Sequence, residues 1–96
     1  MRKVIVIGND HYNTLWLVRS LGMANFEVTS IIRSEGKTSF VEKSKYCSNS
    51  FIVRNFIEML RVLQSMRHGR KVPVIASSDE AAAFLDENYD CLSAQY

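Results

Sequence analysis

The architecture of this chain can be understood from one stretch near its N-terminus, Lys3-Val4-Ile5-Val6-Ile7-Gly8-Asn9-Asp10-His11-Tyr12-Asn13-Thr14-Leu15-Trp16-Leu17-Val18. Its β-branched run, Val4 to Ile7, has no polar alternation, which is typical of a strand covered on both faces. Gly8 lets the chain leave the sheet without a Cβ clash, and a polar loop follows. Asn13 or Thr14 is expected to cap the helix that comes next. Such strand–loop–helix units open nucleotide-type α/β domains, in which ligands lie over the carboxyl end of the strand.

The rest of the chain alternates strands with helices. After the first strand, the pattern predicts a helix over residues 13–23, a strand over 26–32, a polar loop over 33–38 and a short helix over 39–46. A third strand is predicted at 51–53, followed by a helix over 56–67 with Asn55 as its cap and Gly69 at its end. A fourth strand is predicted at 72–76, and Ser77 with Glu80 fits the capping box of a last helix.

This alternation implies right-handed crossovers and a parallel sheet with helices on both faces. We therefore expect one α/β domain over residues 1–96, Rossmann-like and three-layered, with about four strands in the order 3-2-1-4. Ile5, Ile7, Leu60 and Val74 are expected in its core. The apolar residues Trp16, Met23, Tyr89 and Leu92 are candidates for an exposed patch, through which the chain is expected to form a homodimer or to meet a neighbouring domain.

Composition excludes several classes of function. Twelve basic residues stand against 10 acidic ones, and a net charge of +2 is too small to indicate nucleic-acid binding. No signal peptide and no apolar run long enough for a membrane span is found, so we expect a cytoplasmic protein with no membrane partner. Cys47 and Cys91 lack CxxC spacing and are expected to be reduced cysteines, one or both buried, without a metal or redox role.

The strand order places the first and fourth strands side by side, so the loop after each should line one crevice. The candidate site residues are Gly8, Asn9, Asp10, His11, Asn13, Thr14, Ser77, Ser78 and Asp79. Two helix N-termini would aim amides at this crevice and favour a carboxylate or a phosphate. Asp10 and Asp79 oppose an anion unless they turn away. The alternative is that both loops only cap their helices.

Known nucleotide motifs are absent from these loops. The Gly8–Asn13 segment lacks the second and third glycines of GxGxxG, and no GK[ST] follows. A receiver domain needs a phosphoacceptor aspartate at the end of its third strand. This chain has Val53-Arg54-Asn55 there, so the receiver class is excluded. Asp10 and His11 are not expected to be catalytic, and His68 is expected to be a helix-end residue.

Four segments together resemble the start of ATP-grasp ligases of the carbamoyl-phosphate-synthase-like group. They are Val4-Ile5-Val6-Ile7-Gly8, Leu17-Val18-Arg19-Ser20-Leu21-Gly22, Ser44-Lys45-Tyr46 and Pro73-Val74-Ile75-Ala76-Ser77-Ser78-Asp79-Glu80-Ala81. The resemblance extends from Lys3 to Leu92 and is to the pre-ATP-grasp domain of these enzymes. The chain departs from the family at Arg54-Asn55, where the usual connection is longer and contains proline.

This resemblance implies a parent enzyme that uses ATP and magnesium to activate a small carboxylate as an acyl phosphate and then transfers it to an amine. The chain would form one wall of the substrate cleft, would not be catalytic by itself, and would precede an ATP-grasp catalytic module beyond Tyr96. The ATP-binding lysines and the magnesium ligands would belong to that module, so this segment is expected to bind no cofactor. The alternatives are a stand-alone, non-catalytic binding or interaction module and, less favoured, a small Rossmann-like enzyme.

Overall fold

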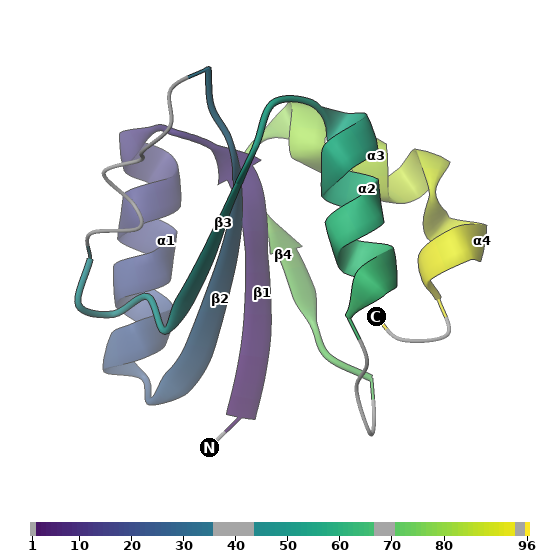
Figure 1. Ribbon diagram of the computed structural model, residues 1–96. Coiled ribbons are helices and arrows are strands. Elements are labelled where there is room, and N and C mark those ends of the chain that lie inside the picture. Colours follow the sequence, from purple (N-terminus) through teal and green to yellow (C-terminus); the bar gives the residue numbers. More distant parts are fainter. Residues whose placement is uncertain (1, 36–43, 67–70, 94–95) are drawn as a thin grey trace.

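A parallel sheet forms the middle of the molecule (Figure 1). The structure, a computed structural model, describes residues 2–35, 44–66, 71–93 and 96. Its strands are β1 (Arg2–Asn9), β2 (Phe26–Arg33), β3 (Asn49–Val53) and β4 (Val74–Ala76), in the order β3-β2-β1-β4. Every pairing is parallel, so the predicted α/β class and strand order are confirmed.

The strands end level with one another on the side where ligands bind in such folds. Asn9, the last residue of β1, pairs with Arg33 of β2, and Arg33 pairs with Val53 of β3. Just beyond, the Ser34 amide donates to the Val53 carbonyl at 2.9 Å. The residues that follow β1, β2 and β3 therefore emerge together at one edge.

Two separate cores lie on the two faces of the sheet, as the unbroken apolar run of β1 requires. Val4 and Val6 pack toward α1 (Tyr12–Met23), whose Val18 is buried among them. Ile5 and Ile7 belong to the opposite core, under α2 (Phe56–Ser65), α3 (Asp79–Glu87) and the short α4 (Tyr89–Leu92). The sheet is thus covered by α1 on one face and by α2 and α3 on the other, giving three layers (Figure 1).

The predicted core is confirmed at its centre and wrong at its margin. Ile5 and Ile7 are 2% and 0% exposed, whereas Leu60 and Val74 are only half-buried. Val74 begins β4, a three-residue strand at the edge of the sheet. Leu60 packs against the core from the flank of α2, where Met59 and Leu63 occupy the inner positions.

Two helix caps differ from the sequence-based expectation. α1 is capped by His11, whose Nδ1 accepts from the Asn13 amide at 3.1 Å, so neither Asn13 nor Thr14 is the cap. α3 is capped by Ser78, whose Oγ accepts from the Ala81 amide at 3.2 Å, so the capping box of Ser77 with Glu80 is wrong. Thr14 and Ser77 instead form a hydrogen bond with each other, and Asn13 lies inside the first turn of α1.

The cap of α2 was predicted correctly. Asn55 Oδ1 accepts from the Glu58 amide at 2.9 Å. α2 ends at Ser65, before the predicted residue 67, and the predicted stop at Gly69 lies outside the described residues.

The described end of the β2–β3 connection, residues 44–48, packs against α1 through Tyr46. The helix predicted over 39–46 lies mostly outside the described residues, and its last part, residues 44–46, forms a turn rather than a helix. The Tyr46 side chain packs on Gly22 of α1, where a Cβ would lie 2.5 Å from the Tyr46 Cβ. Cys47 follows and is half-buried, while Cys91 is exposed; both are free thiols, and the expected burial of at least one is wrong.

Large apolar side chains are exposed along the outer side of α1. Tyr12, Trp16 and Met23 are 68%, 60% and 66% exposed, at positions that share one helix face, and the Arg19 guanidinium lies 4.8 Å from the Trp16 ring. Tyr89 is also exposed, as expected, whereas Leu92 is buried in the core under α4, so its assignment to an exposed patch is wrong. No helix within the described ranges is long and apolar enough to cross a membrane.

Candidate functional site

Three of the predicted site residues meet directly above the ends of β1 and β4. Thr14 Oγ1 donates its one proton to the Asn9 carbonyl at 2.8 Å, so Ser77 Oγ is the donor in its 2.6 Å hydrogen bond to Thr14 Oγ1. Gly8 lies beneath this pair, and a Cβ there would overlap Ser77 Oγ. The loops after the first and fourth strands are thus joined side chain to side chain.

Four other predicted residues lie at the beginnings of the two helices. His11 and Ser78 are the caps of α1 and α3. Asn13 is exposed in the first turn of α1, and Asp79 is exposed as the first residue of α3. The observed contacts of His11 and Ser78 stabilise the two helix ends.

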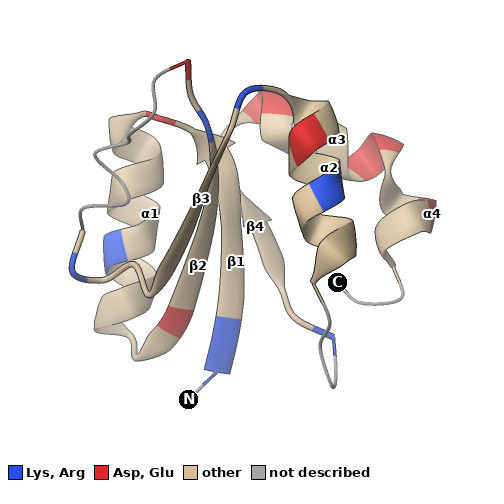
Figure 2. Cartoon of the chain, in the orientation of Figure 1, with Lys and Arg blue, Asp and Glu red and all other residues tan. Residues whose placement is uncertain are grey.

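The remaining two predicted residues, Asn9 and Asp10, line a hollow on the other side of β1. Its other walls are Arg33, Ser34, Glu35 and Arg54, and its volume is about 570 Å³. These residues directly follow or end β1, β2 and β3. Figure 2 shows basic and acidic residues next to one another at this edge of the sheet. We refer to these six residues as the carboxyl-edge hollow.

Arg33 is the most firmly positioned residue of the hollow. Its Nε donates to Asn9 Oδ1 at 3.1 Å, and its Nη2 donates to Glu80 Oε2 of α3 at 2.6 Å. The guanidinium also lies 4.5 Å from the centre of the Phe56 ring of α2. A guanidinium has about five N–H groups, so most of its donors remain for a ligand after these two bonds. Arg33 is therefore a cation held in place before any ligand arrives.

The ring beneath Arg33 is itself fixed. Phe56 stacks on Phe84 of α3 with 5.2 Å between ring centres, and Phe84 is buried. Arg33 thus ties β2 to β1, α2 and α3 at once. The ion pair with Glu80 is partly exposed, with side-chain exposures of 30% and 60%, so by itself it contributes only about 0.2–1 kcal/mol.

Asn9 is oriented by the same interaction. Because its Oδ1 accepts from Arg33 Nε, the two N–H groups of its Nδ2 form the other branch of the amide. These are neutral donors at the wall of the hollow.

Arg54 supplies a second cation from the end of β3. Its backbone amide donates to Glu58 Oε1 at 3.0 Å, which fixes the start of α2 beside the hollow. The Arg54 side chain is exposed, and among the described residues its guanidinium forms no ion pair. It is free to turn toward a ligand.

The hollow carries charges of both signs. Arg33 and Arg54 are balanced by Asp10 and Glu35, and Glu80 further neutralises Arg33. A purely anionic guest would gain from the arginines and lose to the carboxylates, so the electrostatics differ from the anion site expected from the sequence.

Four residues of the hollow are not among the site residues predicted from the sequence: Arg33, Ser34, Glu35 and Arg54. A signal for them exists, because each comes at or directly after the end of an apolar strand. In a parallel sheet such positions gather at the carboxyl edge, where ligands bind.

The described residues do not fit the cofactors that the family resemblance implies. In the described ranges, no group of three or more His, Cys, Asp or Glu side chains is placed to hold a metal ion. The loop after β1 also lacks the glycines with which a backbone approaches a pyrophosphate. We assign no residue of this chain to ATP or magnesium.

Comparisons of the chain with protein-family models, with curated proteins and with solved structures found no match.

Proposed function

We propose that this chain is the N-terminal substrate-cleft domain of an ATP-dependent carboxylate–amine ligase of the ATP-grasp type. The observation that carries the proposal is the carboxyl-edge hollow with its prepositioned Arg33. The four sequence segments that resemble this family, together with a parallel sheet in the order β3-β2-β1-β4, support it.

In this proposal the chain binds and orients the carboxylate. Arg33 and the Asn9 amide are the donors for the carboxylate oxygens, and Arg54, which lines the same hollow, adds charge. A guanidinium held by three neighbours needs little reorganisation on binding, which favours a single orientation of the guest. ATP and magnesium, bound by a downstream catalytic module, would supply the acyl-phosphate activation before an amine attacks. Such an enzyme would work in the cytoplasm, where ATP is available.

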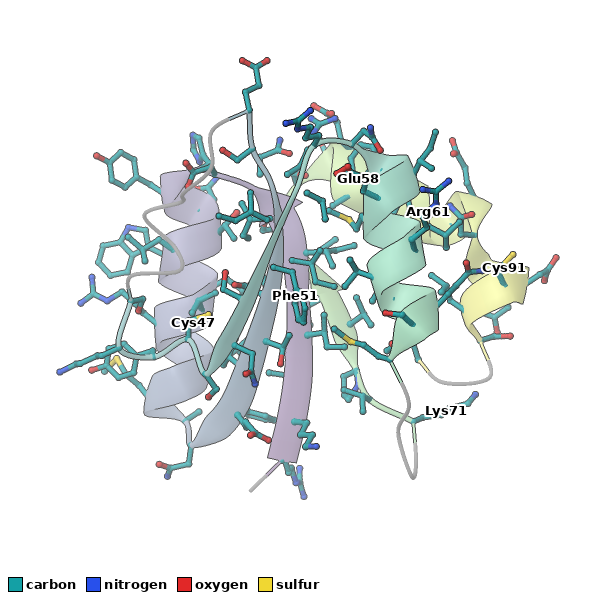
Figure 3. The ribbon with its side chains drawn as sticks, in the orientation of Figure 1. Cys47, Phe51, Glu58, Arg61, Lys71 and Cys91 are labelled. Atoms are coloured by element: carbon teal, nitrogen blue, oxygen red, sulfur yellow. The ribbon has the colours of Figure 1, made fainter. Side chains whose placement is uncertain are left out.

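The test uses the full-length protein encoded by the reading frame that contains these residues. ADP release should depend on both a carboxylate and an amine. Arg33→Gln should raise the KM for the carboxylate by roughly tenfold, since hydrogen bonds to charged groups contribute about 1.5–3 kcal/mol. Arg61→Gln is the matched control, because Arg61 is exposed on α2 (Figure 3) and does not line the hollow. No ADP release with any carboxylate–amine pair of a broad panel would contradict the proposal.

The second candidate function is a stand-alone binding module. It is favoured by the departure of the chain from the family pattern at Arg54-Asn55, where the connection is shorter and has no proline. A reading frame that ends close to Tyr96, combined with ligand binding at the hollow, would decide for this alternative. A frame that continues into a glycine-rich loop and an acidic metal pair would decide for the ligase.

A further inference from the structure

We propose that copies of this chain associate head to tail, with an apolar and basic face of α1 seated on an acidic face of α3 and α4 in the next copy. The α1 face consists of Trp16, Arg19, Ser20 and Met23, and the acidic face consists of Asp86, Glu87, Tyr89 and Asp90. The two faces lie on opposite sides of the sheet (Figure 1), because α1 packs on one core and α3 and α4 pack on the other. This association does not depend on the proposed function.

The α1 face combines exposed apolar side chains with one positive charge. Trp16 and Met23 are two turns apart on the same side of the helix and are 60% and 66% exposed. Arg19 lies between them, with its guanidinium 4.8 Å from the centre of the Trp16 ring. Within the described ranges Arg19 forms no ion pair. The complement of such a face is a surface that offers carboxylates beside an apolar side chain.

The α1 face of a second copy is not that complement. Arg19 is the only charged residue of α1, so packing α1 against its own copy would bring two guanidinium groups together with no carboxylate from either helix. Like charges at an interface disfavour the pairing. The occupant must therefore be a different, acidic surface.

This chain carries such a surface on α3 and α4. Residues 79–92 contain five acidic residues and no basic one, whereas the rest of the chain contains all 12 basic residues and the other five acidic ones. Figure 2 shows acidic residues gathered on α3 and α4 and a basic residue on α1. Asp86, Glu87 and Asp90 are exposed, and none of them forms an ion pair with another described residue. Tyr89 lies among them and is 68% exposed.

The position of two of these carboxylates in α3 is unfavourable for the helix itself. Asp86 and Glu87 are in its last turn, which contains no basic residue. The C-terminal end of a helix carries partial negative charge, so acidic side chains there reduce its stability and a cation increases it. Residues that oppose the local rules of folding are expected where a surface has another use. Arg19 of the next copy would supply the missing cation.

Because each copy uses two different faces, the contact is heterologous and the assembly can grow by repeating it. The contact is small and its ion pairs are exposed, so the association is weak, with a dissociation constant of about 0.1–1 mM at low salt. Salt should weaken it further, because the Debye length falls from about 30 Å at 0.01 M to about 8 Å at 0.15 M ionic strength.

The first measurement is sedimentation velocity of the 96-residue chain at increasing concentration, up to about 1 mM, in low salt. The average mass should rise continuously with concentration. Trp16 is the only tryptophan of the chain, so its fluorescence reports on the α1 face directly, and its emission should shift to shorter wavelength as the chain associates. Both changes should be reversed by added salt.

Variants of the two faces distinguish a head-to-tail contact from other modes of association. Arg19→Glu alters the α1 face, and the double change Asp86→Lys with Glu87→Lys alters the acidic face. Each variant alone should associate at least about tenfold more weakly than the native chain, because like charges then meet at the contact. An equimolar mixture of the two should form a 1:1 complex that does not grow, because each variant contributes the face that it has kept.

Two controls accompany these variants. Lys71→Glu reverses a charge at an exposed residue outside both faces (Figure 3) and should associate like the native chain. Lysine suits the C-terminal end of a helix, so the variant with Lys at positions 86 and 87 should be at least as stable as the native chain in urea unfolding. Its loss of association would then not reflect a loss of the fold.

Four results would overturn the proposal. A native chain that stays monomeric at about 1 mM would leave the α1 face for an acidic partner of another kind. A dimer of fixed size that the acidic-face variant also forms would assign the contact to α1 alone. The other two are a mixture of the two variants that forms no complex, and a Lys71→Glu control that loses association as the face variants do.

Discussion

Gly8 is needed for the space it leaves, not for its backbone angle. None of the described glycines has a positive φ. A side chain at Gly8 would meet Ser77 Oγ, which bonds Thr14 Oγ1 at 2.6 Å across the β1–β4 boundary. Gly8→Ala should therefore destabilise the fold by about 1–3 kcal/mol through overpacking, measured by urea unfolding.

A double-mutant cycle checks the cause of that loss. In a Ser77→Ala background the blocking oxygen is gone, so adding Gly8→Ala should cost clearly less than it does in the native chain. Fully additive losses would show that the two residues do not compete for the same space.

The sequence could identify which residues lie near β1's carboxyl end, but not which partners they choose. Ser77 and Ser78 are both good caps by chemistry, and the order of the letters does not decide between them. Ser78 is the cap because Ser77 is turned toward Thr14 in the tertiary structure. His11 was missed as a cap because histidine is an uncommon one; its role depends on the extended backbone that places Nδ1 over the Asn13 amide.

Among the elements, α3 offers a direct test of the cap. Ser78→Ala should cost about 0.5–2 kcal/mol of unfolding free energy, because an amide of the first turn loses its acceptor. Ser78→Asp should retain most of the stability, since aspartate caps as well and its charge suits the helix N-terminus. Equal losses for both variants would place the stabilising role of Ser78 elsewhere.

At Gly22 of α1, helix propensity and side-chain packing have opposite effects on the stability change expected for an alanine. Gly22→Ala would favour an isolated helix by about 1 kcal/mol, but in this fold the new Cβ would lie 2.5 Å from the Tyr46 Cβ. We expect a net loss of stability by thermal unfolding. Ser20→Ala, an exposed change on the same helix, should give a small gain and serves as the control. A gain for Gly22→Ala would mean that Tyr46 does not pack there.

Elements with strong periodicity were predictable, and those at margins were not. The apolar run of β1 predicts a strand and the spacing of Phe56, Met59 and Leu63 predicts a helix. Both elements form where expected, although α2 ends at Ser65 rather than at residue 67. The edge strands differ in length from the prediction: β3 begins at Asn49, where polar residues gain ladder hydrogen bonds from β2, and β4 is shorter than expected. The length of an edge strand depends on hydrogen bonding to the neighbouring strand, which leaves no periodic pattern in the sequence.

At the scale of the whole molecule, the strand order could be derived because crossover handedness and burial allow few alternatives. The position of the hollow could not be derived, because it depends on which pair of neighbouring strand ends has the space between them filled by side chains. The Thr14–Ser77 contact fills the β1–β4 boundary, while the charged residues that follow β1, β2 and β3 leave space between them. That difference is set by side-chain size and direction.

Because the proposed function assigns ATP and magnesium to a downstream module, we expect that the 96-residue chain alone does not hydrolyse ATP. Phosphoryl transfer needs cationic and metal clamps around the γ-phosphate, and we assign no residue here to either. The measurement is magnesium-dependent phosphate release with and without a small carboxylate such as propionate. Phosphate-releasing activity that co-purifies with the chain and is lost in the Arg33→Gln variant would contradict this expectation.

The central claim is that a small carboxylate binds at the carboxyl-edge hollow, and a map of amide shift changes on adding propionate tests it most directly. The account predicts saturable changes at Asn9, Asp10, Arg33, Ser34 and Arg54, all at one edge of the sheet, with Ser78 and Asp79 nearly unchanged. Changes concentrated at Ser77–Asp79 and at the start of α1, with the amides of Arg33 and Arg54 unmoved, would contradict it.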